Sequence, residues 1–170
     1  MTKHTKPYST LQLTTLVILR FFIGWHLLFE GFSKLMNPNW SSAGFLRESQ
    51  WIMSGFANWA TSNAGVLDVV DFLNTWGLVA IGLGLILGLL GRAAAVSGAI
   101  LLLLYYLNNP PLTGLEYSVP AEGNYLIINK TLIEAVTLFV LSIFPTSHIV
   151  GLDLFLNKIK GISKKGGTYR

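Results

Sequence analysis

The sequence contains no cysteine and unusually little charge. Only 12% of its 170 residues are Asp, Glu, Lys or Arg, whereas 52% are hydrophobic, and the mean hydropathy is +0.54. The lack of cysteine excludes disulfides, thiolate nucleophiles, iron–sulfur ligation and cysteine-type zinc sites. The shortage of charge argues against an ordinary soluble domain, in which about 25% of residues are charged. We therefore expect one integral membrane domain over residues 1–170, and any redox chemistry would need a bound cofactor.

A basic face and a metal-ligand cluster are also missing from the sequence. The net charge is +4, but the basic residues are spread over the chain ends and one turn, which does not form the basic face that nucleic acid requires. His4 lies near the N-terminus and His148 follows the last apolar segment, and no group of His or carboxylate residues has metal-ligand spacing. We expect neither nucleic acid nor a metal ion as a partner.

Long apolar segments are what the sequence has in abundance. Crossing a bilayer takes about 20 residues as a helix, and four spans are predicted, at about residues 12–35, 68–90, 92–107 and 126–145. Gly91 and Arg92 divide the second span from the third, because glycine often follows a helix end and arginine is costly at mid-bilayer. Glycines such as Gly82 predict close packing between these two spans. The expected fold is all-α, an integral membrane four-helix bundle.

Charge is distributed unevenly between the two sides of this topology. If both chain ends and the Gly91 turn share one side, that side holds eight basic residues against Asp153. Much of this charge lies in a basic tail over residues 153–170. The opposite side holds five acidic residues and Arg47. By the positive-inside rule, both termini of this multi-pass protein are expected to be cytoplasmic.

The first outward loop, from about residue 36 to residue 65, has a helical apolar pattern. The pattern predicts a short amphipathic helix that lies in the membrane interface or caps the bundle. A packed loop helix without a function of its own fits the pattern equally well. The apolar face consists of Phe45, Ile52, Phe56 and Trp59, and the polar face of Arg47, Gln50, Ser54 and Asn58.

Ionisable residues inside the first and last spans are the candidate site, because a charge in an apolar span must face protein or water. His26, Glu30 and Lys34 follow one another at four-residue steps, as do Lys130 and Glu134, so each set shares a helix face. We expect a polar pocket between the two spans, open to the outer side. Asn129 would lie at its rim and His26 near its floor.

Two interpretations of this pocket are open. The charges are structural ties, from Glu30 to Lys130 and from Glu134 to Lys34, that fix the register of the helices. Alternatively, the cations attract an anion or a quinone head group, while the carboxylates or His26 exchange protons. In the second case the candidate catalytic residues are Glu30, Glu134 and His26, and the candidate binding residues are Lys34, Lys130, Asn129 and Arg20. Arg20 lies about two turns inside the cytoplasmic boundary, and we favour a tie between helices for it over a head-group contact.

Several runs of residues form a combined motif. They are Arg20–Gly24 with His26, Glu30–Leu35 and Pro38–Trp40, then the Gly88–Arg92 turn, the Tyr105–Pro111 exit and Asn129–Ala135. Together they resemble the DoxX/DoxD family of small bacterial and archaeal membrane proteins, over about residues 10–153. The resemblance implies a four-helix bundle in the bacterial inner membrane. Its DoxD-like branch is associated with thiosulfate:quinone oxidoreductase, which implies a subunit of a quinone-linked oxidoreductase with quinone as cofactor.

Three classes of function are open at this point. The first is the quinone-linked oxidoreductase subunit, which should retain quinone on purification. The second is a non-enzymatic membrane scaffold or assembly subunit. The third is a small-solute or lipid carrier, which the lack of clear inverted repeats in four spans disfavours for a single chain. The expected partners are the lipid bilayer and either other membrane subunits or a second copy of the chain.

Overall fold

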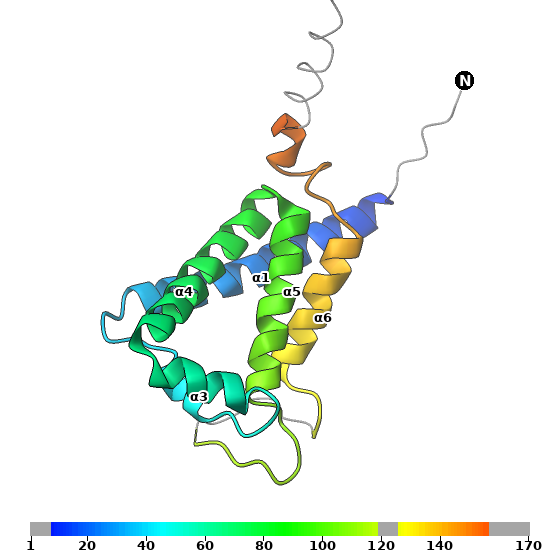
Figure 1. Cartoon of the computed structure of the whole chain (residues 1–170). Helices are drawn as coiled ribbons and strands as arrows, with labels where there is room; N and C mark the ends of the chain where they lie inside the picture. The colour runs from blue at the N-terminus through cyan, green and yellow to red at the C-terminus, as the bar shows by residue number, and fades with distance from the viewer. Residues whose placement is uncertain (1–7, 119–125, 157–170) are drawn as a thin grey trace, which may run out of the picture.

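The computed structural model describes residues 8–118 and 126–156, and its regular elements are α-helices, as the sequence predicts. The bounds are Thr10–Leu35 for α1, Ala43–Arg47 for α2, Ser54–Ser62 for α3, Ala64–Leu87 for α4, Gly91–Asn108 for α5 and Lys130–Ile143 for α6. Of the four longer helices, α1 packs on α4 and α5 packs on α6, and α1 crosses behind α5 and α6 in Figure 1. The two short helices lie at one end. Part of the predicted basic tail, residues 157–170, lies outside the described residues.

Three of the described helices, α1, α4 and α5, are long and apolar enough to cross a membrane. α1 and α5 lie within two residues of the predicted spans 12–35 and 92–107, whereas α4 begins four residues before the predicted residue 68. α6 has 14 residues, shorter than the predicted span 126–145, and at 1.5 Å per residue it extends about 21 Å.

The two ends of the helical assembly hold different segments. One end, which we call the turn end, holds the start of α1, the α4–α5 turn and residues 145–156 (Figure 1). The other, the loop end, holds the last turn of α1 with α2 and α3, the start of α4 and the start of α6. Described segments that flank the uncertain N-terminal and C-terminal residues thus lie at the same end.

The α4–α5 turn lies where the sequence predicts it, but the residue that ends α4 is not the glycine that the sequence analysis chose. Gly88 ends α4 with φ +63, a left-handed backbone that favours glycine. Gly91, which was expected to divide the helices, is the first residue of α5. It must be small for another reason, since a Cβ there would lie 2.7 Å from the Cβ of Ser147.

Glycines set the closest helix contact, which joins α1 to α4. A Cβ on Gly82 would lie 2.6 Å from the backbone nitrogen of Leu28, and one on Gly31 would lie 2.9 Å from the Cβ of Leu78. Gly82 therefore packs against α1, not against the third span as the sequence suggested. Glycine in a helix lets two backbones approach closely where lipid supplies no hydrophobic drive.

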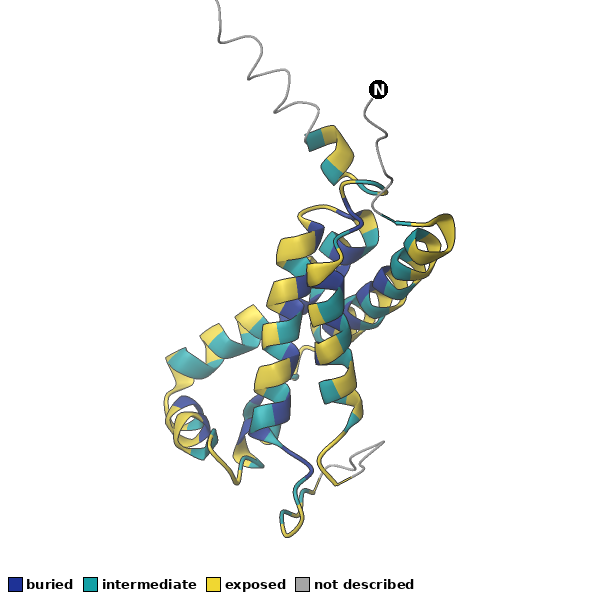
Figure 2. Ribbon diagram, turned by 90° about the vertical axis from the view of Figure 1, so that its right-hand side faces the viewer, coloured by how far each residue is buried: buried dark blue, intermediate teal, exposed yellow. Residues whose placement is uncertain are grey.

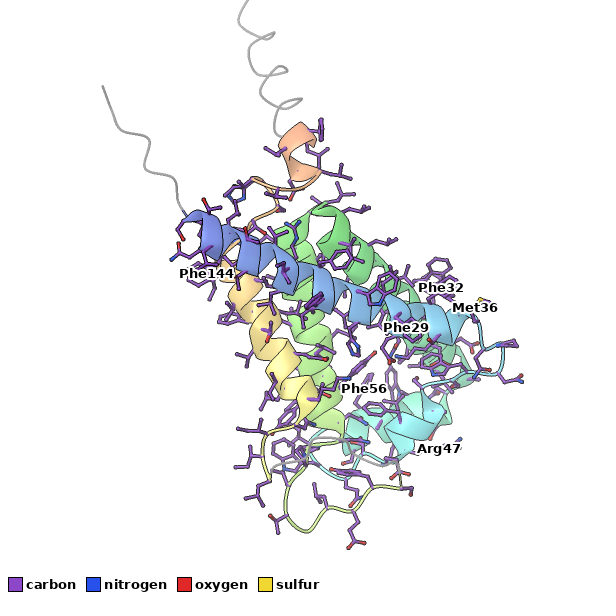
Figure 3. All side chains as sticks on the ribbon, turned by 180° about the vertical axis from the view of Figure 1, so that it is seen from behind. Phe29, Phe32, Met36, Arg47, Phe56 and Phe144 are labelled. Atoms are coloured by element: carbon purple, nitrogen blue, oxygen red, sulfur yellow. The ribbon has the colours of Figure 1, made fainter. Side chains whose placement is uncertain are left out.

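The buried core is made mainly of leucine side chains on α1, α4, α5 and α6. Leu27, Leu78, Leu85 and Leu138 are at most 1% exposed. Figure 2 shows buried residues on the inward faces of the helices and exposed ones on the outward faces. Many exposed side chains are large and apolar, including Phe29 and Phe32 on α1 and Met36 directly after it (Figure 3). An apolar outer surface of this kind suits contact with lipid tails.

The first loop contains two helices where the sequence predicts one, because residues 48–53 interrupt the helical path between α2 and α3. Small side chains face inward on α3: Ala57 and Ala60 are buried with Leu46 and allow close packing on α4. The residues of the predicted apolar face are therefore divided between α2, the connection and α3, and on α3 Phe56 and Trp59 are about half exposed. Placement of this segment in the membrane interface stays a prediction.

Candidate functional site

A hollow of about 170 Å³ between α1, α5 and α6 gathers most of the predicted site residues. We call it the charged hollow. It is lined by five of the seven candidates: His26, Glu30, Lys34, Lys130 and Glu134. Leu27, Leu78 and Leu102 supply apolar wall between them. The four-residue spacing puts each set of charges on one helix face, and the arrangement of α1 and α6 turns the two faces toward the same space.

One ionisable pair joins the two helices across the hollow. His26 Nε2 lies 3.5 Å from Glu134 Oε1. The lysines pair within their own helices, each at 4.0 Å: Lys34 Nζ with Glu30 Oε2, and Lys130 Nζ with Glu134 Oε1. The proposed ties from Glu30 to Lys130 and from Glu134 to Lys34 are not among the ion pairs of the described residues, because each lysine approaches the carboxylate one turn away on its own helix.

The two glutamates differ in their access to the surroundings. The side chain of Glu134 is 14% exposed and faces both His26 and Lys130, whereas that of Glu30 is 49% exposed. A carboxylate withdrawn from water beside a histidine and a lysine can hold or release a proton according to what binds next to it. Glu134 is therefore the better placed of the two for proton exchange.

Two residues that the sequence analysis did not propose for the site complete the surroundings of Lys34. Asn74 on α4 accepts hydrogen bonds at Oδ1 from Lys34 Nζ at 3.3 Å and from Tyr105 Oη at 2.8 Å. Lys34 Nζ also lies 5.2 Å from the ring centre of Trp40 and 5.5 Å from that of Tyr105. Asn74 could have been found as a polar residue inside an apolar span. Tyr105 gave no such signal, since tyrosines at a span end are ordinary interfacial residues.

Asn129 and Arg20 do not line the charged hollow. Asn129 is the N-cap of α6, where its Oδ1 accepts a hydrogen bond from the backbone nitrogen of Leu132 at 2.9 Å. Arg20 is 6% exposed at the turn end. It donates from Nη1 to Thr146 Oγ1 at 3.0 Å and from Nη2 to the carbonyl oxygen of Val150 at 2.8 Å. The sequence analysis favoured a tie between helices for Arg20; both partners lie instead in the segment that follows α6, so Arg20 joins α1 to that segment.

Asp153 completes the polar contacts of the turn end. Its carboxylate accepts hydrogen bonds from the backbone nitrogens of Leu90 at 2.7 Å and Gly91 at 3.2 Å, which caps the start of α5. Burial alone would raise the pKa of Asp153. Hydrogen bonds from Ser147 and from the two backbone N–H groups, with the nearby charge of Arg20, outweigh burial and hold the pKa below its usual range.

The chemistry that these groups allow is binding of a small polar or anionic group with proton exchange. Lysine ammonium groups donate hydrogen bonds to oxygen, and the histidine–glutamate pair is a source and acceptor of protons. Within residues 8–118 and 126–156, no group of three or more His, Asp or Glu side chains is placed to hold a metal ion.

Comparison with known proteins places the chain in one family. The DoxX family model matches residues 15–107, which is more than half of the chain and contains α4, all but the last residue of α5 and most of α1. No curated protein and no solved structure matches the sequence. The matched region holds His26, Glu30, Lys34, Asn74 and Tyr105 but ends before α6. With three helices able to cross a membrane, the chain is a multi-pass membrane protein that belongs to the DoxX family.

Proposed function

We propose that this protein is a membrane subunit of a quinone-linked oxidoreductase, of the thiosulfate:quinone type, and that the charged hollow binds the quinone head group. The observation that carries the proposal is the gathering of Glu134, His26 and two lysines around one hollow walled by leucines. A partly buried acid–histidine pair beside cations is more typical of a functional site than of ordinary packing between membrane helices.

The residues fit such a head group on size and chemistry. A hollow of about 170 Å³ compares with the roughly 150 Å³ in which an apolar protein cavity holds benzene. When bound, quinone accepts two electrons and two protons. The electrons would come from a partner subunit, because this chain has no cysteine to hold an iron–sulfur cluster. Lys34 and Lys130 would bind the carbonyl oxygens, while Glu134 and His26 would hold and release protons.

The proposal includes a complete membrane topology. In it α6 is the fourth crossing of a four-helix bundle, and both termini lie in the cytoplasm of a bacterium whose inner membrane holds the protein. Support comes from the hydrogen bonds that join residues 146–153 to α1 and to the α4–α5 turn, because they keep the start of α1 and the end of α6 on the same side. Arg92 at that turn adds the positive charge expected on a cytoplasmic side.

The test is quinone retention. Protein purified from native membranes should carry bound quinone, and Lys34→Met should reduce the amount at least about tenfold, since a hydrogen bond from a charged group is lost. Glu134→Gln should retain quinone but abolish thiosulfate-dependent quinone reduction in membranes. The control is Arg47→Gln, an exposed residue outside the hollow, which should change neither.

The alternative is a non-enzymatic scaffold, in which the same charges position helices and partners. In that case the wild-type protein would carry no quinone but would copurify with a stoichiometric partner, and Lys34→Met would lower recovery of that complex. Such a result would overturn the quinone proposal.

A further inference from the structure

The charged hollow is one of three adjoining cavities. The second, which we call the middle cavity, measures about 290 Å³ and shares Lys34 and Tyr105 with the charged hollow. The third, which we call the roof cavity, measures about 220 Å³ and lies between the two short helices and α4 and α5. It shares Ser42, Phe45, Asn74 and Tyr105 with the middle cavity. Each cavity is smaller than an ordinary ligand site of about 300–1,000 Å³, whereas the three joined fall within that range.

The walls become less polar from the charged hollow to the roof cavity. Five ionisable side chains line the charged hollow. Lys34, Asn74 and two serines line the middle cavity together with three aromatic rings. The lining of the roof cavity is nearly all apolar, and its Asn108, 2% exposed, donates from Nδ2 to the carbonyl oxygen of Phe45 at 2.9 Å. A ligand that fills all three cavities needs a polar head group and an apolar tail.

A loosely held cation lies at the boundary between the charged hollow and the middle cavity. Lys34 Nζ lies 4.0 Å from Glu30 Oε2, 3.3 Å from Asn74 Oδ1 and 5.5 Å from the ring centre of Tyr105. Because lysine has a flexible four-carbon stem, the ammonium group can turn toward a bound oxygen while the backbone stays in place. That movement would open the boundary to a ligand that occupies both cavities.

Asn74 offers a second donor beside Lys34. Its Oδ1 accepts from both Lys34 Nζ and Tyr105 Oη, which fixes the orientation of the amide. Within the described residues, Asn74 Nδ2 has no partner. An oxygen atom of a ligand at this boundary can therefore accept from the amide of Asn74 as well as from Lys34.

The chemistry of quinones relates this boundary to a tail. In a quinone that carries a hydrocarbon tail, the ring carbon that bears the tail is bonded to a carbonyl carbon, so one carbonyl oxygen lies beside the start of the tail. Within the described chain, Lys34 lines both the charged hollow and the middle cavity, whereas Lys130 on α6 lines the charged hollow alone. Lys34 therefore suits the carbonyl beside the tail, and Lys130 suits the opposite one.

The roof cavity has a lateral opening. Phe56, Leu73 and Leu104 line it and are 43%, 62% and 43% exposed, respectively. They belong to α3, α4 and α5, and the last two of these helices are able to cross the membrane. A tail longer than the cavities can therefore continue between these helices into the bilayer.

We propose that the substrate is a lipid quinone whose tail leaves the charged hollow past Lys34, lies in the middle and roof cavities and enters the bilayer between α3, α4 and α5. This placement of the tail rests on the proposed function, because the head group lies in the charged hollow. It adds the class of quinone, a tailed one that arrives from the bilayer, and it gives the two short helices a role as one wall of the tail site.

Two quinones with the same ring separate the two levels of the proposal. Tetramethyl-1,4-benzoquinone has no tail, and in its analogue one methyl group is replaced by a decyl group. Calorimetric titration of the full chain in detergent, with titration into empty micelles subtracted, should show saturable binding of both. If neither binds, the proposed function itself fails. If the tailless quinone binds and the tailed one does not, the tail site is refuted and the head-group site stands.

A photoreactive diazirine at the end of the decyl tail locates the tail directly. After illumination, adducts should lie on lining residues of the roof cavity, within 53–56, 70–73 and 101–104. They should disappear when excess tetramethyl-1,4-benzoquinone occupies the charged hollow. Adducts on α1 or α6, or no adduct that the tailless quinone displaces, would overturn the placement of the tail.

Two neighbouring leucines on α5 supply a matched pair of variants. Leu104 lines the roof cavity and is 43% exposed, and Leu103, outside its lining, is 44% exposed. Leu104→Trp should weaken binding of the decyl quinone at least about tenfold and leave the tailless quinone unchanged, because the larger ring takes the space of the tail. Leu103→Trp should change neither. Each variant is compared with wild type for the same ligand, so partition into micelles cancels.

Unchanged affinity of the folded Leu104→Trp variant for the decyl quinone would contradict the tail site. If this variant does not fold, the adducts on the wild-type chain still decide where the tail lies. Lys34→Met should weaken both quinones, since it acts on the head group that they share.

Discussion

The turn end and the loop end use charge in opposite ways. At the turn end, Arg20 and Asp153 each make two direct hydrogen bonds to groups from distant parts of the chain, at 2.7–3.2 Å. At the loop end, the ion pairs of His26, Lys34 and Lys130 measure 3.5–4.0 Å and surround a hollow. One helix, α1, thus carries a structural charge near its middle and loosely paired charges along its second half.

The difference teaches which charges are available for chemistry. A charged group held by short hydrogen bonds is fixed, and removing it leaves its partners unsatisfied. A pair near 4 Å contributes little stability and can change partners when a ligand arrives. Stability measurements on variants should therefore separate the two ends, and the following tests run from the largest expected effect to the smallest.

Arg20→Ala should give the largest loss. It leaves Thr146 Oγ1 and the carbonyl of Val150 without their charged donor inside the assembly, which should lower the free energy of unfolding by about 3 kcal/mol. The exposed Arg92→Ala should stay within about 0.5 kcal/mol of wild type. Unfolding in mixed micelles with a denaturing detergent measures both, and equal losses would show that the turn end is not held by Arg20.

Asp153→Ala should cost about 1 kcal/mol at neutral pH, as for other lost helix caps, because the N–H groups of Leu90 and Gly91 lose their acceptor. The loss should depend on pH. Since the folded pKa of Asp153 is below its usual range, its stabilisation is complete above the unfolded value of about 3.9 and is lost as the pH falls through the lower folded value. The gap between wild type and variant should narrow below about pH 4, and a gap that widened there would contradict this account.

Tyr105→Phe tests the loop end with an effect of about 1 kcal/mol, the typical contribution of one hydrogen bond. It removes the bond to Asn74 and should also reduce quinone retention, because Asn74 then holds Lys34 alone. Tyr106→Phe removes a bond to the carbonyl of Ile127 and is the matched control. It should cost similar stability and leave quinone retention unchanged.

Glu30→Gln should have the smallest effect, within about 0.5 kcal/mol, because the carboxylate is half exposed and lies 4.0 Å from Lys34. Chemical denaturation at low and high salt measures it, and the small difference should disappear at high salt. A loss comparable with that of Arg20→Ala would remove the contrast between the two ends.

The positions of the long helices in the sequence were largely predictable, because a long apolar run indicates where a chain can cross a bilayer. The α4–α5 turn and the shared faces of His26, Glu30 and Lys34 follow from local spacing alone. The contacts between residues of different helices do not follow from local spacing. Gly82 packs on α1, and His26 pairs with Glu134, because the rotation of each helix about its axis depends on contacts between segments far apart in sequence.

The remaining differences have similar causes. The break between α2 and α3 depends on how small residues such as Ala57 fit against α4, which hydrophobic periodicity does not register. Asn74 was visible as a polar residue inside an apolar span, but its partners Lys34 and Tyr105 come from two other helices. Asn108 looked like an ordinary helix end beside Asn109 and prolines, and only the fold shows that it is buried.

The cap that Asp153 places on α5 has a consequence for biosynthesis. The hairpin of α4 and α5 leaves the ribosome more than forty residues before residue 153 does, so its exposed N–H groups first meet water or lipid head groups. Arg20 is synthesised earlier still, and its partners Thr146 and Val150 follow more than a hundred residues later. A nascent chain that stops before Pro145 would insert its first helices into the membrane but would lack the contacts that join the first and last parts of the protein at the turn end. Quality-control proteases would then recognise the chain by the unpaired groups at that end.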